Sequence, residues 1–255
     1  MESRMYDDTA RFQDKHWYLI GMREIVFELF GRERTSPSLQ ILDLGCGTGQ
    51  YLPGLSRLGQ VVGLDRAPEA LALSSRHGGP HSLLIRGDAR ELPLQSRSFD
   101  LVWASSILEH LPEDVSGLQE AVRVLKPEGR MVILVPAHHF LWGHHDDLAH
   151  HLRRYSREEL ENLCRKCGLR IVRSTHYGAT PLPPAYLVRK FKNILGRFYP
   201  RMREVSDFRL ASFPGLNPLF LSILRLEKLG LSRLNLPFGL MLYALVEKDF
   251  DGRKR

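Results

Sequence analysis

Residues 41–49 read ILDLGCGTG, a short apolar run that ends among three glycines, Gly45, Gly47 and Gly49. An apolar run of this length bounded by glycine predicts a buried strand and a turn. Glycine adopts positive φ at little steric cost and lets a ligand approach the backbone closely. The stretch therefore predicts a ligand-binding turn between a strand at 41–45 and a helix at 50–58.

Strand-length and helix-length segments alternate along the rest of the chain. Further strands are expected at 61–65, 82–88, 98–105, 130–137, 169–178 and 239–248. Helices are expected at 12–30, 68–76, 114–125 and 156–167. This alternation is typical of an α/β protein with a doubly wound, mostly parallel sheet, in which ligands bind outside the carboxyl ends of the strands.

Three acidic residues stand at the carboxyl ends of the first three strands. Asp43 lies inside the first strand, where it would repel a phosphate but suits a cationic ligand with a free amino group. Asp65 ends the second strand, where a carboxylate can accept hydrogen bonds from ribose hydroxyls. Asp88 follows the third strand and could accept from an adenine amino group. Each acid alone also fits an ordinary turn, but their order along the chain favours a nucleoside ligand.

These segments resemble the class I S-adenosylmethionine-dependent methyltransferase family. The resemblance covers residues 38–178 and is carried by LDLGCGTG (42–49), VVGLD (61–65), GDARELPLQSRSFDLVWASSILEHL (87–111) and VLKPEGRMVILVP (124–136). It implies a Rossmann-like, seven-stranded sheet whose last strand is antiparallel, and S-adenosyl-L-methionine as the cofactor. The cofactor contacts that it implies are Asp43, Gly45, Cys46, Gly47 and Gly49 at the methionine end, Asp65 and Arg66 at the ribose, Asp88 and Ala89 at the adenine, and Ser105 beneath the sulfonium.

The segment HWYLIGMR (16–23) is similar to one that precedes the glycine turn in a bacterial branch of the family. The similarity implies that Trp17 and Tyr18 cover the cofactor and that Arg23 pairs with its carboxylate. In the alternative interpretation, the aromatic residues are ordinary helix core and Arg23 lies on the surface.

We expect a single compact domain in which four parts can be distinguished. These are an N-terminal helical lid at 1–36, a cofactor-binding α/β core at 37–178, a basic helical cap at 179–240 between strands six and seven, and the last strand and tail at 241–255. An insertion after strand six could fold back over the binding crevice.

The cap holds the excess positive charge of the chain. Residues 179–240 contain ten Lys and Arg but three acids, a difference equal to the net charge of +7 of the whole chain. Such a segment can attract nucleic acid, an anionic membrane surface or an acidic substrate, and it also fits a solvated helical surface. Leu187, Phe191 and Ile194 recur at helical spacing between basic residues, which favours peripheral membrane contact through 187–203, a lid over an apolar substrate, or a cap packed on the sheet.

The composition excludes several other classes of protein. No apolar run approaches 18 residues, so no membrane-spanning segment is expected. The N-terminus has no apolar core of the kind found in a secretory signal. Three cysteines do not suggest a disulfide framework, which favours a reduced, cytoplasmic setting.

Residues 141–156, LWGHHDDLAHHLRRYS, are rich in histidine. His144, Asp147 and His151 could share a helical face, but Arg153 and Arg154 disfavour a dication, and no metal site is predicted. The segment is also similar to one in the same bacterial branch, which makes His145 or His151 a candidate general base oriented by Asp146. Alternatively, Asp146 pairs with Arg153 or Arg154 and braces the lid. The residues expected at the substrate pocket are His110, Trp142, Arg154 and Tyr155.

The residues after the fourth strand bear on the acceptor. This stretch reads ASSILEHL, without the Asn/Asp-Pro-Pro-aromatic motif of family members that methylate amino groups of nucleic-acid bases. We therefore expect methylation of oxygen or carbon on a small-molecule or lipid-like acceptor, and no nucleic-acid partner. The alternatives are an RNA methyltransferase that uses the basic cap, and a non-catalytic or repurposed protein that binds S-adenosylmethionine.

Overall fold

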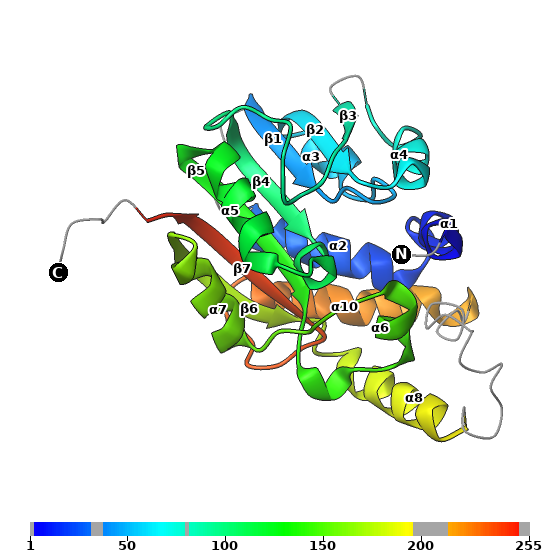
Figure 1. Cartoon of the computed structure of the whole chain (residues 1–255). Helices are drawn as coiled ribbons and strands as arrows, with labels where there is room; N and C mark the ends of the chain where they lie inside the picture. Colours follow the sequence, from blue (N-terminus) through cyan, green and yellow to red (C-terminus); the bar gives the residue numbers. More distant parts are fainter. Residues whose placement is uncertain (1–2, 32–37, 80–81, 196–213, 250–255) are drawn as a thin grey trace.

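A computed structural model describes residues 3–31, 38–79, 82–195 and 214–249. Seven strands form one sheet in the order β3-β2-β1-β4-β5-β7-β6 (Figure 1). The strands are β1 (Leu39–Leu44), β2 (Gly59–Asp65), β3 (Ser82–Arg86), β4 (Phe99–Ser105), β5 (Leu125–Pro136), β6 (Leu169–Tyr177) and β7 (Met241–Lys248). Only β7 runs antiparallel to its neighbours, because it pairs antiparallel with both β5 and β6. The predicted α/β architecture with its antiparallel last strand is confirmed.

The strand order reverses beside β1. The chain runs from β1 outward to β2 and β3, and then returns to β4 on the other side of β1. The loops that leave β1 and β4 therefore diverge and open a crevice at the carboxyl edge of the sheet.

Helices cover both faces of the sheet (Figure 1). They are α1 (Ser3–Phe12), α2 (Trp17–Phe30), α3 (Leu52–Leu55), α4 (Pro68–Ser74), α5 (Asp114–Val124), α6 (His144–Ala149), α7 (Arg157–Lys166), α8 (Leu182–Leu195) and α10 (Asn217–Leu231), with short 3-10 turns η1 (Leu108–His110), η2 (His139–Leu141) and η4 (Pro214–Leu216). The apolar sides of α5 and α7 pack on one face. On the other face α2, α3 and α10 pack around Trp103, whose ring lies 5.3 Å from that of Phe27.

The structure differs from the expected elements in three places. The helix at 50–58 is the short turn α3, because Gly54 fits tightly under Phe27 and the chain enters β2 at Gly59. The strand expected at 130–137 is the later part of a longer strand, β5, in which Leu125 already pairs with Phe99. The first helix, α1, had not been predicted at all.

The two outer parts are also placed differently from the expected lid and cap. Most of the buried residues of α2 contact the sheet core, so among the described residues of 1–36 it is α1 that lies over the crevice. α10 packs along α2, where Gly21 leaves room for Leu224. None of the described residues in 179–240 lines the cavity in the crevice. Of the described part of this segment, α10 is a layer on the face of the sheet that holds Trp103.

Glu227 fastens α10 to the end of β6. Its carboxylate accepts hydrogen bonds from the backbone N–H groups of Gly178, Ala179 and Thr180 at 2.7–2.9 Å, and from the Thr180 hydroxyl at 2.7 Å. We expect Glu227→Ala to lower the free energy of unfolding by about 2 kcal/mol, because it leaves these donors without their charged acceptor. Urea unfolding measures the loss.

Glu24→Ala is the matched control for this substitution. Glu24 joins α2 to α10 through surface ion pairs with Arg225 and Lys228, which contribute little because water screens them. A loss for Glu227→Ala that is no larger than the loss for Glu24→Ala would contradict the fastening role.

Candidate active site

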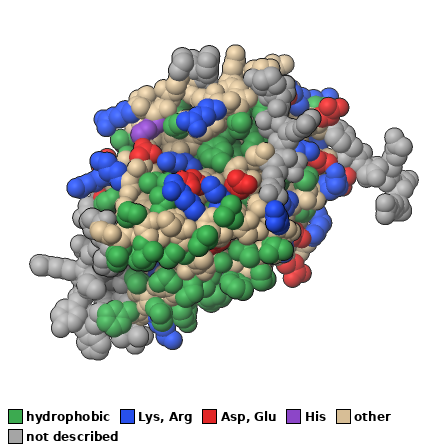
Figure 2. Space-filling view, turned by 180° about the vertical axis from the view of Figure 1, so that it is seen from behind, with side chains coloured by type: hydrophobic (Ala, Val, Ile, Leu, Met, Phe, Trp, Pro, Cys, Tyr) green, Lys and Arg blue, Asp and Glu red, His purple; other side chains and the backbone are tan. Residues whose placement is uncertain are grey.

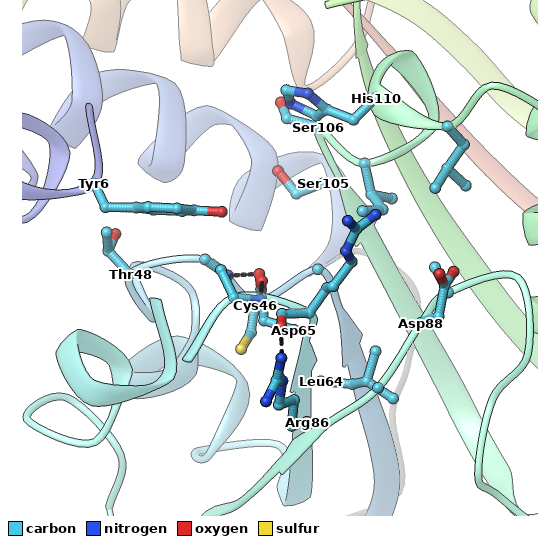
Figure 3. A pocket seen from close by; sticks show the side chains of 18 of the residues that line it. Tyr6, Cys46, Thr48, Leu64, Asp65, Arg86, Asp88, Ser105, Ser106 and His110 are labelled. Carbon is cyan, nitrogen blue, oxygen red and sulfur yellow. Dashed lines mark hydrogen bonds between the residues drawn. The ribbon is translucent and has the colours of Figure 1, made fainter. Parts of the chain in front are cut away.

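A cavity of about 590 Å³ occupies the crevice where the strand order reverses (Figure 3). Its wall comes from the segments that follow β1, β2, β3 and β4, together with α1 and His150. The predicted residues that line it are Gly45, Cys46, Gly47, Asp65, Arg66, Asp88, Ala89, Ser105 and His110. The loops that the sequence predicted to share one ligand thus converge on one cavity.

The glycine turn needs its glycines for two different reasons. Gly45 and Gly47 have φ of 72° and 53°, which side chains disfavour. A Cβ on Gly45 would also lie 2.8 Å from Ile107, whereas a Cβ on Gly47 would meet nothing closer than 4.0 Å. Gly45 is therefore required by packing, and Gly47 keeps open a wall of the cavity.

Asp65 holds this turn against the end of β2. One carboxylate oxygen accepts the N–H of Gly47 and the other accepts the N–H of Ala67, both at 2.9 Å. Each oxygen keeps a lone pair for a further donor. A ligand with two neighbouring hydroxyls can use both of them.

Asp43 is a buried carboxylate with an oxygen that the described residues leave without a hydrogen bond. Its Oδ2 has no hydrogen-bond partner in the part of the chain that the structure describes. Burial, and then the negative charge of Asp65, raise the pKa of Asp43 to about 8. Asp43 does not itself line the cavity, although its neighbours Gly45 and Cys46 do. A cationic amino group near this carboxylate would offset its burial.

Asp88, unlike Asp43, has a cationic partner for its carboxylate. Arg90 donates from Nε and Nη2 to the two carboxylate oxygens at 3.0 and 2.8 Å, and from its backbone N–H at 2.9 Å. These hydrogen bonds lower the pKa of Asp88 to about 2. Asp88 is a fixed anion at the edge of the cavity.

The sequence predictions missed the part played by α1. Tyr6 and Thr9 line the cavity, and Tyr6 reaches into it with its hydroxyl directed toward the middle (Figure 3). Gln13 accepts a 2.6 Å hydrogen bond from the hydroxyl of Thr48 in the glycine turn. Residues 6, 9 and 13 fall on one helical face, and that spacing was the signal available in the sequence.

The aromatic residues of HWYLIGMR do not line the cavity. Trp17 packs against Phe220 of α10, with ring centroids 5.1 Å apart, and Tyr18 packs against the core of that face. Arg23 donates to the backbone oxygen of Gln50, which does line the cavity, and to Asp14. Its role toward a cofactor carboxylate stays a prediction.

The histidine segment contributes one residue to the cavity wall, His150. α6 ends at Ala149, and His150 adopts the left-handed conformation with φ of 55°. His144, Asp147 and His151 therefore do not share a helical face, because the helix stops before His151.

Asp146 is the buried centre of this segment. Arg154 donates to its two oxygens from Nε and Nη2, each at 3.0 Å, and His151 Nδ1 lies 2.8 Å from Oδ1. Although burial raises the pKa of Asp146, these bonds outweigh it and the pKa is lowered. The brace expected for Asp146 is formed with Arg154, while Arg153 pairs with Asp114.

The other residues expected at the substrate pocket lie outside the cavity wall. Trp142 is exposed and donates to Asp147, whereas Tyr155 is buried and donates to Asp114 at 2.9 Å. The ring centroid of His145 is 6.1 Å from that of His151. The catalytic role expected of His145, His151 and Asp146 stays a prediction.

Glu109 was not singled out from the sequence. It precedes His110 in η1 and is fully buried, and neither carboxylate oxygen has a hydrogen-bond partner among the described residues. Burial raises its pKa to about 7, and the nearby His151 and Arg154 act against that rise. Burial lowers the pKa of His110 to about 4.

Comparison with known proteins gives a consistent set of matches. Residues 42–133 match the family model described as a methyltransferase domain. The chain is 32% identical over 155 residues to a trans-aconitate 2-methyltransferase of Deinococcus radiodurans, with 59% of this chain and 55% of the relative covered. It is 33% identical over 140 residues to a demethylmenaquinone methyltransferase of Lactiplantibacillus plantarum, with 51% and 56% covered.

The matched region spans little more than half the length of these curated relatives. Among solved structures, an S-adenosylmethionine-dependent methyltransferase from Mesorhizobium loti aligns with a TM-score of 0.56 at 17% identity. The alignment covers 86% of this chain and 95% of that one. At this identity the likeness shows the fold alone.

The glycine turn can be tested with a matched pair of alanine substitutions. Gly47 and Gly168 both have positive φ, and neither has an atom close enough to clash with a new Cβ. We expect Gly47→Ala and Gly168→Ala each to lower the free energy of unfolding by about 1–2 kcal/mol, the cost of the left-handed conformation. Only Gly47→Ala should weaken S-adenosylmethionine binding in isothermal titration calorimetry, because only its methyl group enters the cavity wall. Equal affinities in the two variants would show that the cofactor does not approach Gly47.

Proposed function

We propose that the chain is a class I S-adenosylmethionine-dependent methyltransferase, in line with the matched methyltransferase domain and relatives, and that it transfers a methyl group to a small-molecule or lipid-like acceptor, on oxygen or carbon. The observation that carries the proposal is the convergence of the glycine turn, Asp65, Asp88 and Ser105 on one cavity at the reversal of strand order.

The residues present fit S-adenosyl-L-methionine. The orphaned, buried carboxylate of Asp43 suits the amino group at the methionine end. The two oxygens of Asp65 suit a pair of ribose hydroxyls. Asp88, Ala89 and Arg66 line the same cavity, and the proposal assigns Asp88 and Ala89 to the adenine and Arg66 to the ribose.

When bound, the cofactor supplies a sulfonium methyl group that is already electrophilic. The protein must therefore align the acceptor with the methyl group, exclude water and remove a proton where the acceptor needs it. Tyr6 and Thr9 of α1 line the cavity on the side of the glycine turn, and we assign that side to the cofactor. Ser106 and His110 lie together on its wall, with His110 next to His151 of the histidine segment, and we assign that side to the acceptor.

The general base is predicted to be either His145 or His151. His151 is the better placed of the two, because its ring centroid lies 4.8 Å from that of His110 in the cavity wall. Its Nδ1 is also bonded to Asp146, which would orient the ring.

The printed names of the relatives support a small acceptor. One relative is named for trans-aconitate and the other for demethylmenaquinone. They differ in acceptor, so the class of acceptor is proposed here and not its identity. RNA methylation and cofactor binding without transfer remain the alternatives.

A membrane-facing surface is the second part of the proposal. Exposed apolar side chains follow one face of α10 at helical spacing, and others stand on α8. They are Leu216, Leu219, Ile223, Leu226 and Leu229, and Leu187, Val188 and Phe191. Figure 2 shows hydrophobic side chains gathered over the lower part of this side of the molecule.

None of the described helices is long and apolar enough to cross a bilayer. Apolar side chains in a basic segment suit a helix lying on an anionic membrane. The expected contact through 187–203 lies partly outside the described residues.

Methyl transfer can be tested with a methyl-labelled cofactor and a lysate as the source of acceptors. We expect label to enter the organic-extractable fraction. Asp65→Ala should raise the Kd of the cofactor about ten- to a hundredfold, because it removes a charged acceptor of hydrogen bonds. Asp100→Ala is the control, since Asp100 pairs with Lys126 away from the cavity.

Other outcomes would select an alternative. Label found only in nuclease-sensitive material would favour the RNA methyltransferase. Tight cofactor binding with no labelled product would favour the non-catalytic protein.

Membrane contact can be tested by flotation with vesicles. We expect the protein to float with vesicles that contain anionic phosphatidylglycerol and not with pure phosphatidylcholine, because the cap carries the excess positive charge. The double substitution Leu226→Glu and Leu229→Glu should abolish flotation. Leu83→Glu adds one negative charge at an exposed apolar residue of edge strand β3 and should leave flotation unchanged. Absence of the native protein from the floated fraction would refute the membrane contact.

A further inference from the structure

Three side chains meet directly behind the acceptor end of the cavity. Glu109 and His110 come from η1, and His151 comes from the histidine segment. The carboxylate oxygen and the two ring nitrogens that they offer all lie within 4.8 Å of one another. The backbone N–H of Leu152 donates to the backbone oxygen of Glu109 at 2.8 Å, which holds the two segments together.

The Glu109 carboxylate is the member of this group that lacks a partner. It is fully buried, and neither oxygen has a partner in good hydrogen-bond geometry among the described residues, although the Ser106 side chain and the Glu109 N–H lie near enough to act against the rise in its pKa. An unpaired buried carboxylate is destabilising, so such groups are normally neutralised, paired or bound to a metal ion. The side chain faces the two imidazoles, which can supply ligand atoms but no permanent charge.

His151 is already oriented as a metal ligand would be. Its Nδ1 is 2.8 Å from the Asp146 carboxylate, so Nδ1 carries the proton and Nε2 presents its lone pair on the other side of the ring. A hydrogen bond from the second ring nitrogen to a carboxylate is the usual support of a histidine that binds metal. Arg154 and the N–H of Gly143 hold Asp146 in place.

We propose that Glu109, His110 and His151 bind a divalent first-row transition-metal ion at the acceptor end of the cavity. Two imidazoles and one carboxylate form a ligand set that such ions accept with open positions remaining. Ligand atoms about 2.1 Å from a tetrahedral ion are about 3.4 Å apart, so the group would contract by about 1 Å on binding.

The arginines next to the histidines do not oppose this site. From the sequence, the charges of Arg153 and Arg154 were the reason to predict no metal site. In the structure Arg154 is neutralised by Asp146, and Arg153 pairs with Asp114 and donates to the backbone of Pro112. With both histidines neutral, the Glu109 carboxylate leaves the site with a negative charge.

The site goes beyond methyl transfer as such, and binding of the ion does not depend on it. His110 lines the cavity, so an open position on the ion can face an acceptor. There it would bind an acceptor oxygen and favour its deprotonated form. His151 would then act as a ligand, because a ring nitrogen that holds a metal ion cannot accept a proton.

The test is a metal titration of the full-length protein without a polyhistidine tag. The protein is treated with a chelator, dialysed and titrated with ZnCl₂ by calorimetry and with CoCl₂ by visible absorption. We expect one equivalent to bind, with Co²⁺ bands typical of nitrogen and oxygen ligands. Glu109→Gln and His151→Ala should each raise the Kd at least tenfold. His139→Ala is the control, because it removes an exposed histidine that pairs with Glu159.

Each result decides the proposal. Absence of saturable binding by the native protein would overturn it. An affinity unchanged by Glu109→Gln and His151→Ala, or lowered as much by His139→Ala, would show an adventitious ion only. Thermal unfolding shows whether each variant is folded; if Glu109→Gln is not, His151→Ala and the Co²⁺ spectrum decide. Cofactor affinity is measured in parallel, so a chain that binds cofactor but no metal refutes this inference alone.

Discussion

The hydrogen bond from the N–H of Gly47 to the carboxylate of Asp65 joins the two loops on which the cavity depends. It links the turn after β1 to the end of β2, at the place where the order of the strands reverses. The left-handed φ of Gly47 aims its N–H at the carboxylate without putting a side chain into the cavity. At Gly45 and Gly47 the wall of the cavity is therefore backbone, and a ligand can approach it closely there.

The two ends of the cavity differ in the partners that their carboxylates have. At the end proposed for the cofactor, the carboxylates of Asp65 and Asp88 accept hydrogen bonds from backbone N–H groups and from Arg90. At the acceptor end, Glu109 is buried without a partner beside two histidines. A preorganised anion suits the binding of hydroxyl and amino groups, whereas an unsatisfied carboxylate suits a proton or a metal ion. Both ends are built from segments that follow strands at the same edge of the sheet, so the fold can place the two kinds of carboxylate in one cavity.

The helices that flank the sheet have different roles. α10 completes the packing of the sheet face around Trp103 and is fastened by Glu227. Its opposite face stays apolar and exposed. α1 covers the cavity and is held by the bond between Gln13 and Thr48. The N-terminal segment is thus divided between α2, which belongs to the core, and α1, which belongs to the site.

The sequence by itself determined the sheet, its glycine turn and the acids that follow the strands. These features are local: an apolar run, a glycine or a strand-ending acid has its meaning within a few residues, and the parallel order brings the strand ends together. Tertiary structure alone decided which distant residues meet. It placed Tyr6 over the cavity and Trp17 against Phe220, and it brought Glu109 to His151 across more than forty positions of the chain. It also gave Arg154 and Arg153 their own carboxylates, so the charges that argued against a metal site in the sequence are neutralised in the fold. Contacts of this kind depend on packing between elements, which no local pattern encodes.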